Sequence, residues 1–341
     1  MLQNPMKNST ESPQSCSTEY DCIDETHSSP TTSLLPSKAG HENAIEKIGV
    51  NINLHQPNLS SSDGDCEYLV PTKAETILAT ETTKISVDKD FRIRSENIQM
   101  LKRGIASGNS AYVHLANYTR NAITIKVAVK ILKPNCRKGD TLEEIKLLSS
   151  CKHENIVTFV GWMEPPEVVK FNDAMETSDE QMGIITEYMG GGDLHTYLIN
   201  NENRPTINKI FAFTFQVFNA MIYLHDKGII HRDLAARNCL LNENYEILKL
   251  NDFGISRETD TNGVYKQITL RKLPLCWLPL ETLLDPSIFT RKGDIWAFGV
   301  LLWEMYQRGK QPYGAKDQFE LKQLLTNGER LSKPEYCHEV L

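Results

Sequence analysis

Aromatic side chains are confined almost entirely to one part of this chain, and that distribution decides where a core can form. Of the Phe, Trp and Tyr residues, only Tyr20 and Tyr68 precede residue 91. The first 90 residues contain 22 Ser or Thr, and their 14 acidic residues against six Lys give a net charge of −8. A segment with few large apolar groups and excess charge buries too little surface to offset its chain entropy. We therefore expect residues 1–90 to be a disordered acidic tail and residues 91–341 to be the folded part.

The folded part changes from strand patterns to helix patterns along its length. Alternating apolar residues predict a strand at Ile123–Leu132, and shorter apolar runs predict strands at Asn155–Trp162 and Gly183–Met189. Helical spacing predicts helices at Thr141–Ser150 and Ile210–Leu224, with further helices towards the end of the chain. Strands followed by helices are typical of an α+β protein with a sheet-rich part and a helix-rich part.

Charge and cysteine content exclude several classes of protein. The whole chain carries a net charge of −7, whereas a nucleic-acid-binding protein usually shows a basic excess. The eight Cys residues form no C-x-x-C pair, so neither a disulfide framework nor a zinc site is expected. No apolar secretory segment opens the chain, and no apolar run approaches the ~18 residues of a membrane span. We expect a cytoplasmic setting, which includes the intracellular part of a membrane receptor.

The strongest chemical signal is a pair of motifs, His231–Asn238 with the sequence HRDLAARN and Asp252–Gly254 with the sequence DFG. Asp233 supplies a carboxylate that can meet a substrate hydroxyl. Asn238 and Asp252 add an amide and a second carboxylate, whose oxygens are ligands that Mg²⁺ accepts. Phosphoryl transfer needs these parts, because its transition state is stabilised mainly by positioning and charge neutralisation. The alternative is that Asp233 and Asp252 are two ordinary carboxylates on surface loops.

These motifs resemble those of the protein kinases, and specifically the tyrosine kinases, over residues 91–341. The resemblance implies a two-lobed α+β fold, with a mainly β small lobe at about 91–187 and a mainly α large lobe at about 190–341. It implies transfer of the γ-phosphate of ATP, with Mg²⁺, to a Tyr hydroxyl of a protein substrate. In that assignment Asp233 receives the hydroxyl proton, and Asn238 and Asp252 hold Mg²⁺.

Two features of the resemblance favour tyrosine as the acceptor. Ala235 stands where serine/threonine kinases usually carry a Lys, and Arg237 would supply the positive charge instead. The segment Lys272–Trp277 resembles the platform on which an acceptor peptide lies, with Pro274 making room for the large phenol. The same Ala-Ala-Arg form leans towards receptor kinases, and dual specificity stays open.

The resemblance also implies a nucleotide site. Lys130 ends an apolar strand, where its charge is costly to bury without a partner, and the helix spacing makes Glu144 that partner in preference to Glu143. Asp193 is as well suited to capping a helix as to binding ribose. The residues implied in nucleotide binding are Ile105, Ala106, Gly108, Val113, Ala128, Lys130, Thr186, Glu187, Met189 and Leu240.

Regulatory and supporting residues follow from the same comparison. Tyr265 stands 13 residues after Asp252, where the family carries a phosphorylated Tyr, and Arg232 would neutralise the added charge. The alternative for Tyr265 is an exposed loop residue without a role. Phe253 and Gly254 complete the regulatory set, and His231, Asp294 and Glu281 are expected to be structural.

The sequence departs from the family in ways that leave a second function open. Only Gly108 remains of the glycines in the phosphate-binding loop, Ala106–Val113, so we expect weakened nucleotide affinity. The last helices of the large lobe are not represented before Leu341, so Glu281 is expected to lack its usual Arg partner. A polar insertion at Glu164–Gln181 is expected to be a surface loop. The alternative function is therefore a pseudokinase or regulatory scaffold of the same fold.

One tail residue suggests a partner. Tyr68 follows Asp63, Asp65 and Glu67 and stands three residues before Pro71. This context suits a tyrosine-kinase substrate and a docking site for a phosphotyrosine-reading domain. The alternative is an unmodified Tyr in a tail.

Overall fold

The computed structural model describes residues 88–107, 111–133, 138–164, 182–200, 205–267, 273–314, 316–335 and 337, together with the backbone of Tyr68–Leu69. The chain divides into two units, and the described residues all belong to the second, Ser62–Leu341. The tail expected at residues 1–90 and the insertion expected at 164–181 lie almost entirely outside the described residues, so both stay predictions.

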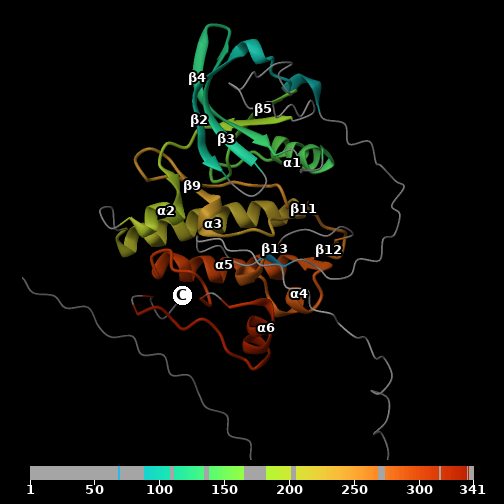
Figure 1. Cartoon of the computed structure of the whole chain (residues 1–341), viewed down its shortest axis with the longest axis vertical. Helices are drawn as coiled ribbons and strands as arrows, with labels where there is room; N and C mark the ends of the chain where they lie inside the picture. Colours follow the sequence, from blue (N-terminus) through green and yellow to red (C-terminus); the bar gives the residue numbers. More distant parts are fainter. Residues whose placement is uncertain are drawn as a thin grey trace, which may run out of the picture. The chain divides into compact units, whose positions relative to one another are not determined.

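The small lobe is built on a five-stranded antiparallel sheet with the strand order β2-β3-β4-β6-β5, shown at the top of Figure 1. The predicted strand Ile123–Leu132 is confirmed as β4. Its β-branched side chains fit a pleated sheet, which explains why this segment forms a strand. The elements of this lobe are η1 Lys89–Phe91, η2 Ser95–Asn97, β2 Ile98–Ser107, β3 Ala111–Arg120, β4 Ile123–Leu132, α1 Lys138–Ser150, β5 Phe159–Met163 and β6 Gly183–Glu187.

One strand begins later than the sequence predicted. The apolar run from Asn155 was expected to be a strand throughout, but β5 starts at Phe159. Ile156 and Val157 are buried because they contact the large lobe: Ile156 bridges to Leu250, and the Val157 N–H donates to the Leu250 carbonyl at 2.9 Å. The first part of the apolar run therefore packs between the lobes, and only the part from Phe159 onwards is a strand of the sheet.

The large lobe is mainly helical, which confirms the two-lobed α+β architecture. The predicted helix Ile210–Leu224 is longer at both ends, since Thr206 accepts a hydrogen bond from Lys209 N and so caps the N-terminus. The elements of this lobe are β7 Gly192–Asp193, α2 Leu194–Ile199, α3 Ile207–Asp226, β8 Ile229–Ile230, η3 Ala236–Asn238, β9 Cys239–Leu241, β10 Leu248–Leu250, β11 Arg257–Glu258, β12 Val264–Lys266, β13 Leu273–Pro274, η4 Leu275–Trp277, α4 Leu280–Leu284, β14 Ile288–Thr290, α5 Arg291–Tyr306 and α6 Gln318–Thr326. Outside both lobes in sequence, β1 Tyr68–Leu69 pairs with β13.

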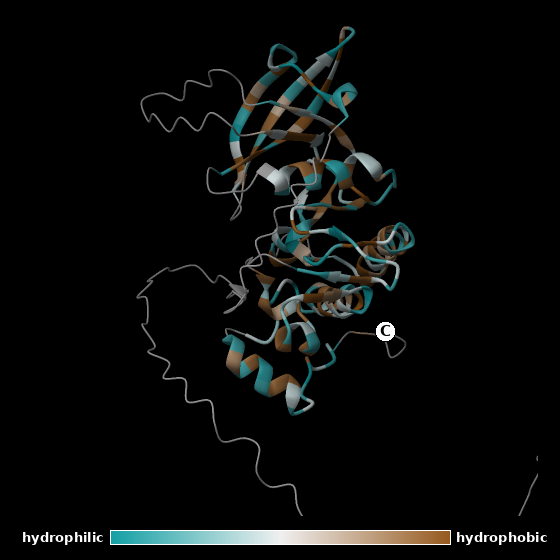
Figure 2. Ribbon diagram, turned by 90° about the vertical axis from the view of Figure 1, so that its right-hand side faces the viewer, coloured by the Kyte–Doolittle hydropathy of each residue, from teal (hydrophilic) through white to brown (hydrophobic). Residues whose placement is uncertain are grey.

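Helices α3 and α5 form the centre of the large-lobe core, and Figure 2 shows their apolar residues in brown. In the described part of the chain, α3 is the one helix whose length and composition would suffice to cross a bilayer. One face of α3 is buried in the protein core, including Phe213, Val217 and Leu224, so we interpret it as a core helix. Its other face exposes Phe211 and Phe215.

Candidate active site

The loop His231–Asn238, here called the catalytic loop, is held at its start by a buried carboxylate. Asp294 on α5 accepts hydrogen bonds from the backbone N–H of His231 at 2.8 Å and of Arg232 at 2.9 Å. It also contacts His225 Nε2 at 3.0 Å. Arg232 has φ +71°, a left-handed conformation that costs a non-glycine residue energy, so these bonds stabilise a strained turn. The expected bracing contacts of Asp294 are therefore present.

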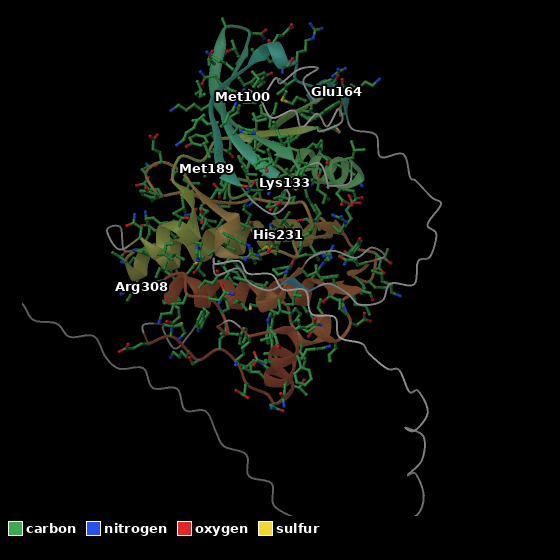
Figure 3. The ribbon with its side chains drawn as sticks, in the orientation of Figure 1. Met100, Lys133, Glu164, Met189, His231 and Arg308 are labelled. Atoms are coloured by element: carbon green, nitrogen blue, oxygen red, sulfur yellow. The ribbon has the colours of Figure 1, made fainter. Side chains whose placement is uncertain are left out.

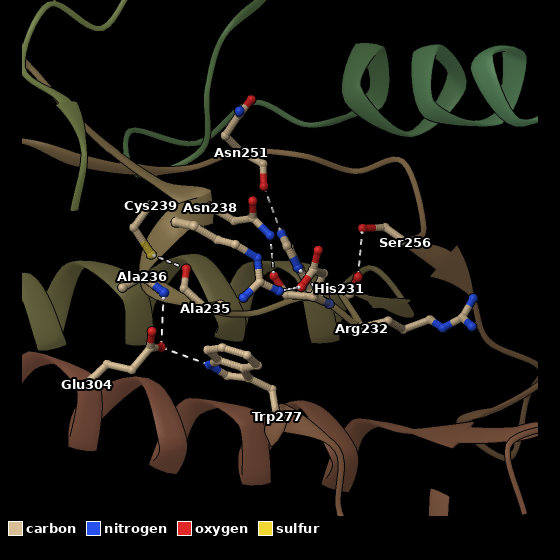
Figure 4. A network of polar contacts seen from close by, with 12 residues as sticks. His231, Arg232, Ala235, Ala236, Asn238, Cys239, Asn251, Ser256, Trp277 and Glu304 are labelled. Atoms are coloured by element: carbon tan, nitrogen blue, oxygen red, sulfur yellow. Dashed lines mark hydrogen bonds and ion pairs between the residues drawn. The ribbon is translucent and has the colours of Figure 1, made fainter. Parts of the chain in front are cut away.

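His231 anchors the same loop from the opposite side. Its Nε2 lies 3.1 Å from the Asn251 carbonyl, and its own carbonyl accepts a hydrogen bond from Ser256 Oγ at 3.1 Å (Figure 4). Its ring packs edge-on against Phe253, with centroids 5.2 Å apart. Both side chains are fully buried, so the catalytic loop and the segment Asp252–Gly254 are fixed to each other.

Two polar side chains at the end of the catalytic loop, Arg237 and Asn238, bond to Asp233. Arg237 forms an ion pair with the Asp233 carboxylate. Asn238 Nδ2 donates to the Asp233 carbonyl at 2.8 Å. Asp233 is half-buried, so its carboxylate is oriented by Arg237 and still accessible to a substrate.

Lys130 connects the two lobes through two carboxylates. Its Nζ lies 2.7 Å from Glu144 Oε1 on α1 and 2.8 Å from Asp252 Oδ1 in the large lobe. Burial alone would lower the pKa of Lys130, but Asp252 and Glu144 outweigh it and raise that pKa above its ordinary value. The pKa of Asp252 is lowered, since Lys130 outweighs the effect of burial. Glu143 pairs elsewhere, with Arg257 at 3.0 Å, which agrees with the choice of Glu144.

Four of the predicted nucleotide residues in the sheet share one of its faces. Val113 pairs directly with Lys130 across β3 and β4, and Ala128 pairs with Thr186 across β4 and β6. Directly paired residues share a face, as do residues two apart in a strand, so these four side chains line the same surface. Ala106 pairs with Val113 and extends this surface, and Ile105 neighbours it in β2. Gly108 lies outside the described residues.

The segment after β6 connects the lobes, and Figure 3 labels Met189 there and His231 below it, beside α3. Met189 is buried. Glu187 accepts hydrogen bonds from Thr158 N and Lys249 Nζ, both at 2.6 Å, so its side chain fixes the segment. Gly191 is required there, because a Cβ would lie 2.3 Å from the Asn242 carbonyl oxygen.

Asp193 and Leu240 adjoin this connecting segment. Of the two roles left open for Asp193, the structure shows the helix cap: its Oδ1 accepts from Thr196 N at 2.9 Å at the start of α2. Leu240 pairs with Asp193 across β7 and β9 and is half-buried. Both residues therefore lie next to the segment that joins the lobes.

The donor set of Asp252 and Asn238 fits a Mg²⁺ ion. Asp252 offers a carboxylate whose side chain is 36% exposed, and Asn238 has its Nδ2 engaged, which leaves the Oδ1 atom for a cation. Within the described ranges, no cluster of three or more His, Cys, Asp or Glu could hold a metal by itself. A site of few protein ligands suits Mg²⁺, because that ion usually keeps water and substrate phosphate oxygens in its shell.

Tyr265 and Arg232 lie close together. Tyr265 is in β12, and the Arg232 guanidinium carbon lies 4.9 Å from the centroid of its ring. Arg232 also lies 3.7 Å from the Phe289 centroid and bonds to Gln267. Glu281 on α4 is exposed.

Glu304 is a site residue that the sequence reasoning missed. Its Oε2 accepts hydrogen bonds from Trp277 Nε1 at 2.8 Å and from Ala236 N at 3.1 Å (Figure 4). The Trp277 ring in turn lies 4.4 Å from the guanidinium carbon of Arg237, which pairs with Asp233. Burial raises the pKa of Glu304 to about 7. The available signal was the one charged residue in the apolar run Ile295–Tyr306 of helix α5.

Comparison with known proteins agrees with this geometry. Residues 99–341 match the family described as protein tyrosine and serine/threonine kinase. The chain is 38% identical over 226 residues to the tyrosine-protein kinase transmembrane receptor Ror of Drosophila melanogaster, covering 64% of this chain and 30% of that protein. It is 36% identical to the tyrosine-protein kinase receptor TYRO3 of Danio rerio, over 62% of this chain and 24% of the relative.

A third relative is the tyrosine-protein kinase Fer of Homo sapiens, 30% identical over 83% of this chain and 32% of the relative. The chain thus spans about a third or less of the length of each of these three proteins. The matched range contains the catalytic loop, Asp252, Lys130 and Glu144. The chain therefore belongs to the protein tyrosine and serine/threonine kinase family.

Proposed function

We propose that this chain is an ATP- and Mg²⁺-dependent protein-tyrosine kinase. The observation that carries the proposal is the contact of Lys130 Nζ with both Glu144 and Asp252. That contact brings the small-lobe amine to the large-lobe carboxylate beside the catalytic loop. A cation and an anion assembled in this way suit the phosphates and the metal ion of a nucleotide, respectively.

Nucleotide binding is assigned to the face of the sheet and to the connecting segment. Lys130 would neutralise the α- and β-phosphates, while Val113 and Ala128 enclose the adenine. The backbone groups of Glu187 and Met189 would hydrogen-bond its edge, and Thr186 would close the back of the pocket. Because the Glu187 N–H already donates to the Thr158 carbonyl at 3.0 Å, we assign the adenine contact to the Glu187 carbonyl.

Phosphate transfer is assigned to the catalytic loop. Asp233, held by Arg237, accepts the proton of the Tyr hydroxyl as the oxygen attacks the γ-phosphorus and the bond to the β-phosphate oxygen breaks. Arg237 also supplies positive charge near the transferred group. Asn238 and Asp252 would hold Mg²⁺, which when bound neutralises phosphate charge.

Acceptor choice and regulation are assigned to the segment between Asp252 and Glu281. Pro274 in β13 would admit a Tyr side chain, and phosphorylation of Tyr265 would add charge that the adjacent Arg232 neutralises. This assignment is supported by the Arg232 guanidinium carbon, which lies 4.9 Å from the centroid of the Tyr265 ring.

Phe253 and Gly254 would couple phosphorylation of that segment to the metal site. The Phe253 ring packs against His231 of the catalytic loop, and the Gly254 N–H donates to Asp252 Oδ1 at 3.3 Å. A shift of the segment would therefore be transmitted to both the catalytic loop and Asp252.

Partners and location follow from the same proposal. The substrates would be proteins with an acceptor Tyr, and phosphorylated Tyr68 would recruit a phosphotyrosine-reading domain. Cys151 and Cys239 are buried thiols, which suits a reducing compartment, and we place the domain in the cytoplasm.

The test is phosphate transfer by the full chain to a Tyr-containing peptide with Mg-ATP. We expect Asp233→Asn to abolish phosphate transfer and to retain nucleotide binding, which is measured by thermal shift. Asp226→Asn is the matched control, because Asp226 is exposed at the end of α3 and outside the site. ATP binding without transfer by the unsubstituted chain would instead support the pseudokinase.

A further inference from the structure

A short piece of the tail pairs with the segment assigned to acceptor peptides. β1 runs antiparallel to β13, with Tyr68 opposite Pro274 and Leu69 opposite Leu273. Figure 1 shows this pair as a short blue strand beside the orange β13, two segments that are far apart in sequence. Both strands lie in the same unit of the chain, Ser62–Leu341.

β13 is connected to the catalytic loop through the residues that follow it. β13 leads directly into η4, which carries Trp277. The Trp277 ring contacts Arg237, and Arg237 pairs with Asp233. Leu273, Pro274 and Leu275 are all buried, so β13 is fixed in the large lobe. A strand on its edge is therefore bound next to the catalytic loop.

The edge of β13 is suited to an extended peptide. β1 and β13 form a sheet of two strands, so in the described part of the chain β1 is the one strand that pairs with β13. Backbone pairing of this kind is how sheet edges capture peptides, and register then decides which side chain is presented. A pair of two residues is weak, so the segment can leave and other peptides can take its place.

The residue in register is a potential acceptor. Tyr68 is one of only two Tyr residues before residue 91, and it stands opposite Pro274, the residue assigned above to admitting a phenol. The other, Tyr20, lies outside the described residues. The register thus brings Tyr68 to β13.

We propose that Tyr68 is an intramolecular acceptor, and that its segment excludes other acceptor peptides from β13 while it is docked. This rests on the proposed kinase function. In the transfer, a bond forms between Tyr68 Oη and the γ-phosphorus of ATP, the bond from that phosphorus to the β-phosphate oxygen breaks, and ADP leaves. The hydroxyl proton goes to Asp233 and then to water. The added phosphate charge beside Asp233 would favour release of the segment and open the edge to substrates.

The test uses the phosphatase-treated full chain with Mg-ATP and follows Tyr68 phosphate by mass spectrometry. For an intramolecular reaction, the rate constant stays the same over a roughly hundredfold range of enzyme concentration. Leu69→Pro removes a backbone N–H from the pairing, so we expect Tyr68 phosphorylation to slow by about tenfold or more. Leu69→Pro should also lower the KM for an acceptor peptide, because the segment no longer occupies β13. Tyr68→Phe removes the acceptor hydroxyl but keeps the pairing, so the KM for the peptide should stay high.

Leu54→Pro is the matched control, because it places the same substitution in the tail outside β1 and should change neither quantity. A Tyr68 rate proportional to enzyme concentration, or an unchanged rate and KM in Leu69→Pro, would overturn the inference. Peptide phosphorylation with Tyr68 left unmodified would overturn it too, with the kinase function intact. Failure of every variant to phosphorylate either acceptor would remove the kinase function and this inference together.

Discussion

The ion pair between Lys130 and Glu144 makes the sharpest prediction, because the neighbouring residue supplies a matched control. Glu144→Gln removes the charge of a side chain that is 4% exposed, opposite a Lys130 side chain that is 16% exposed. Breaking a buried pair costs about 3–5 kcal/mol. Lys130 keeps Asp252 at 2.8 Å, so we expect the lower end, about 3 kcal/mol, in the free energy of unfolding.

Glu143→Gln makes the same chemical change one residue earlier. Glu143 is 34% exposed, and its partner Arg257 also contacts Asp140 at 3.5 Å, so the loss should stay below about 1 kcal/mol. The assay is urea unfolding at constant m-value, with KM for ATP measured in parallel. Glu144→Gln should also raise that KM, since Lys130 would lose its orientation. Equal losses for the two variants would refute the reasoning.

Three further predictions concern the supporting residues. The pKa of Glu304 is raised from 4.5 to about 7, so between these pH values the native state holds a proton that the unfolded state has released. The free energy of unfolding should therefore fall by up to about 3 kcal/mol as the pH rises from 5 to 8. Urea titrations at several pH values should show this fall, and Glu304→Gln should flatten it. Asp294→Asn weakens two charge-assisted bonds to the catalytic loop, so we expect kcat to fall with the Kd for ATP unchanged, and an equal change in both would argue against a bracing role. Gly191→Ala places a Cβ 2.3 Å from a backbone oxygen and should lower Tm, whereas at Gly139, where a Cβ meets nothing within 4 Å, Gly139→Ala should leave Tm unchanged or raise it.

The sequence predicted elements whose pattern depends on local periodicity. β4 was predicted to the residue, since alternation is a direct consequence of strand geometry. The helix at α3 was placed correctly but too short, because its cap at Thr206 lies outside the apolar pattern. β5 was extended too far, since burial of Ile156 against the other lobe produces the same apolar run as a strand.

The candidate site was predictable where motifs are contiguous and not where separate segments meet. Asp233, Asn238 and Asp252 were identified from two short motifs. The contact of Glu304 with Trp277 joins α5 to η4 through tertiary packing, and nothing in an apolar helix pattern indicates it. The pairing of Tyr68 with Pro274 could not be predicted from the sequence either, because the composition of the tail predicts no strand.

The most direct measurement of the central claim is the identity of the phosphorylated residue. The full chain would be incubated with Mg-ATP and with peptides that differ only in carrying Tyr, Ser or Phe at one position. We expect phosphate on the Tyr peptide alone, and none on any peptide with Asp233→Asn. Phosphate on Ser in preference to Tyr, or transfer that survives Asp233→Asn, would contradict it.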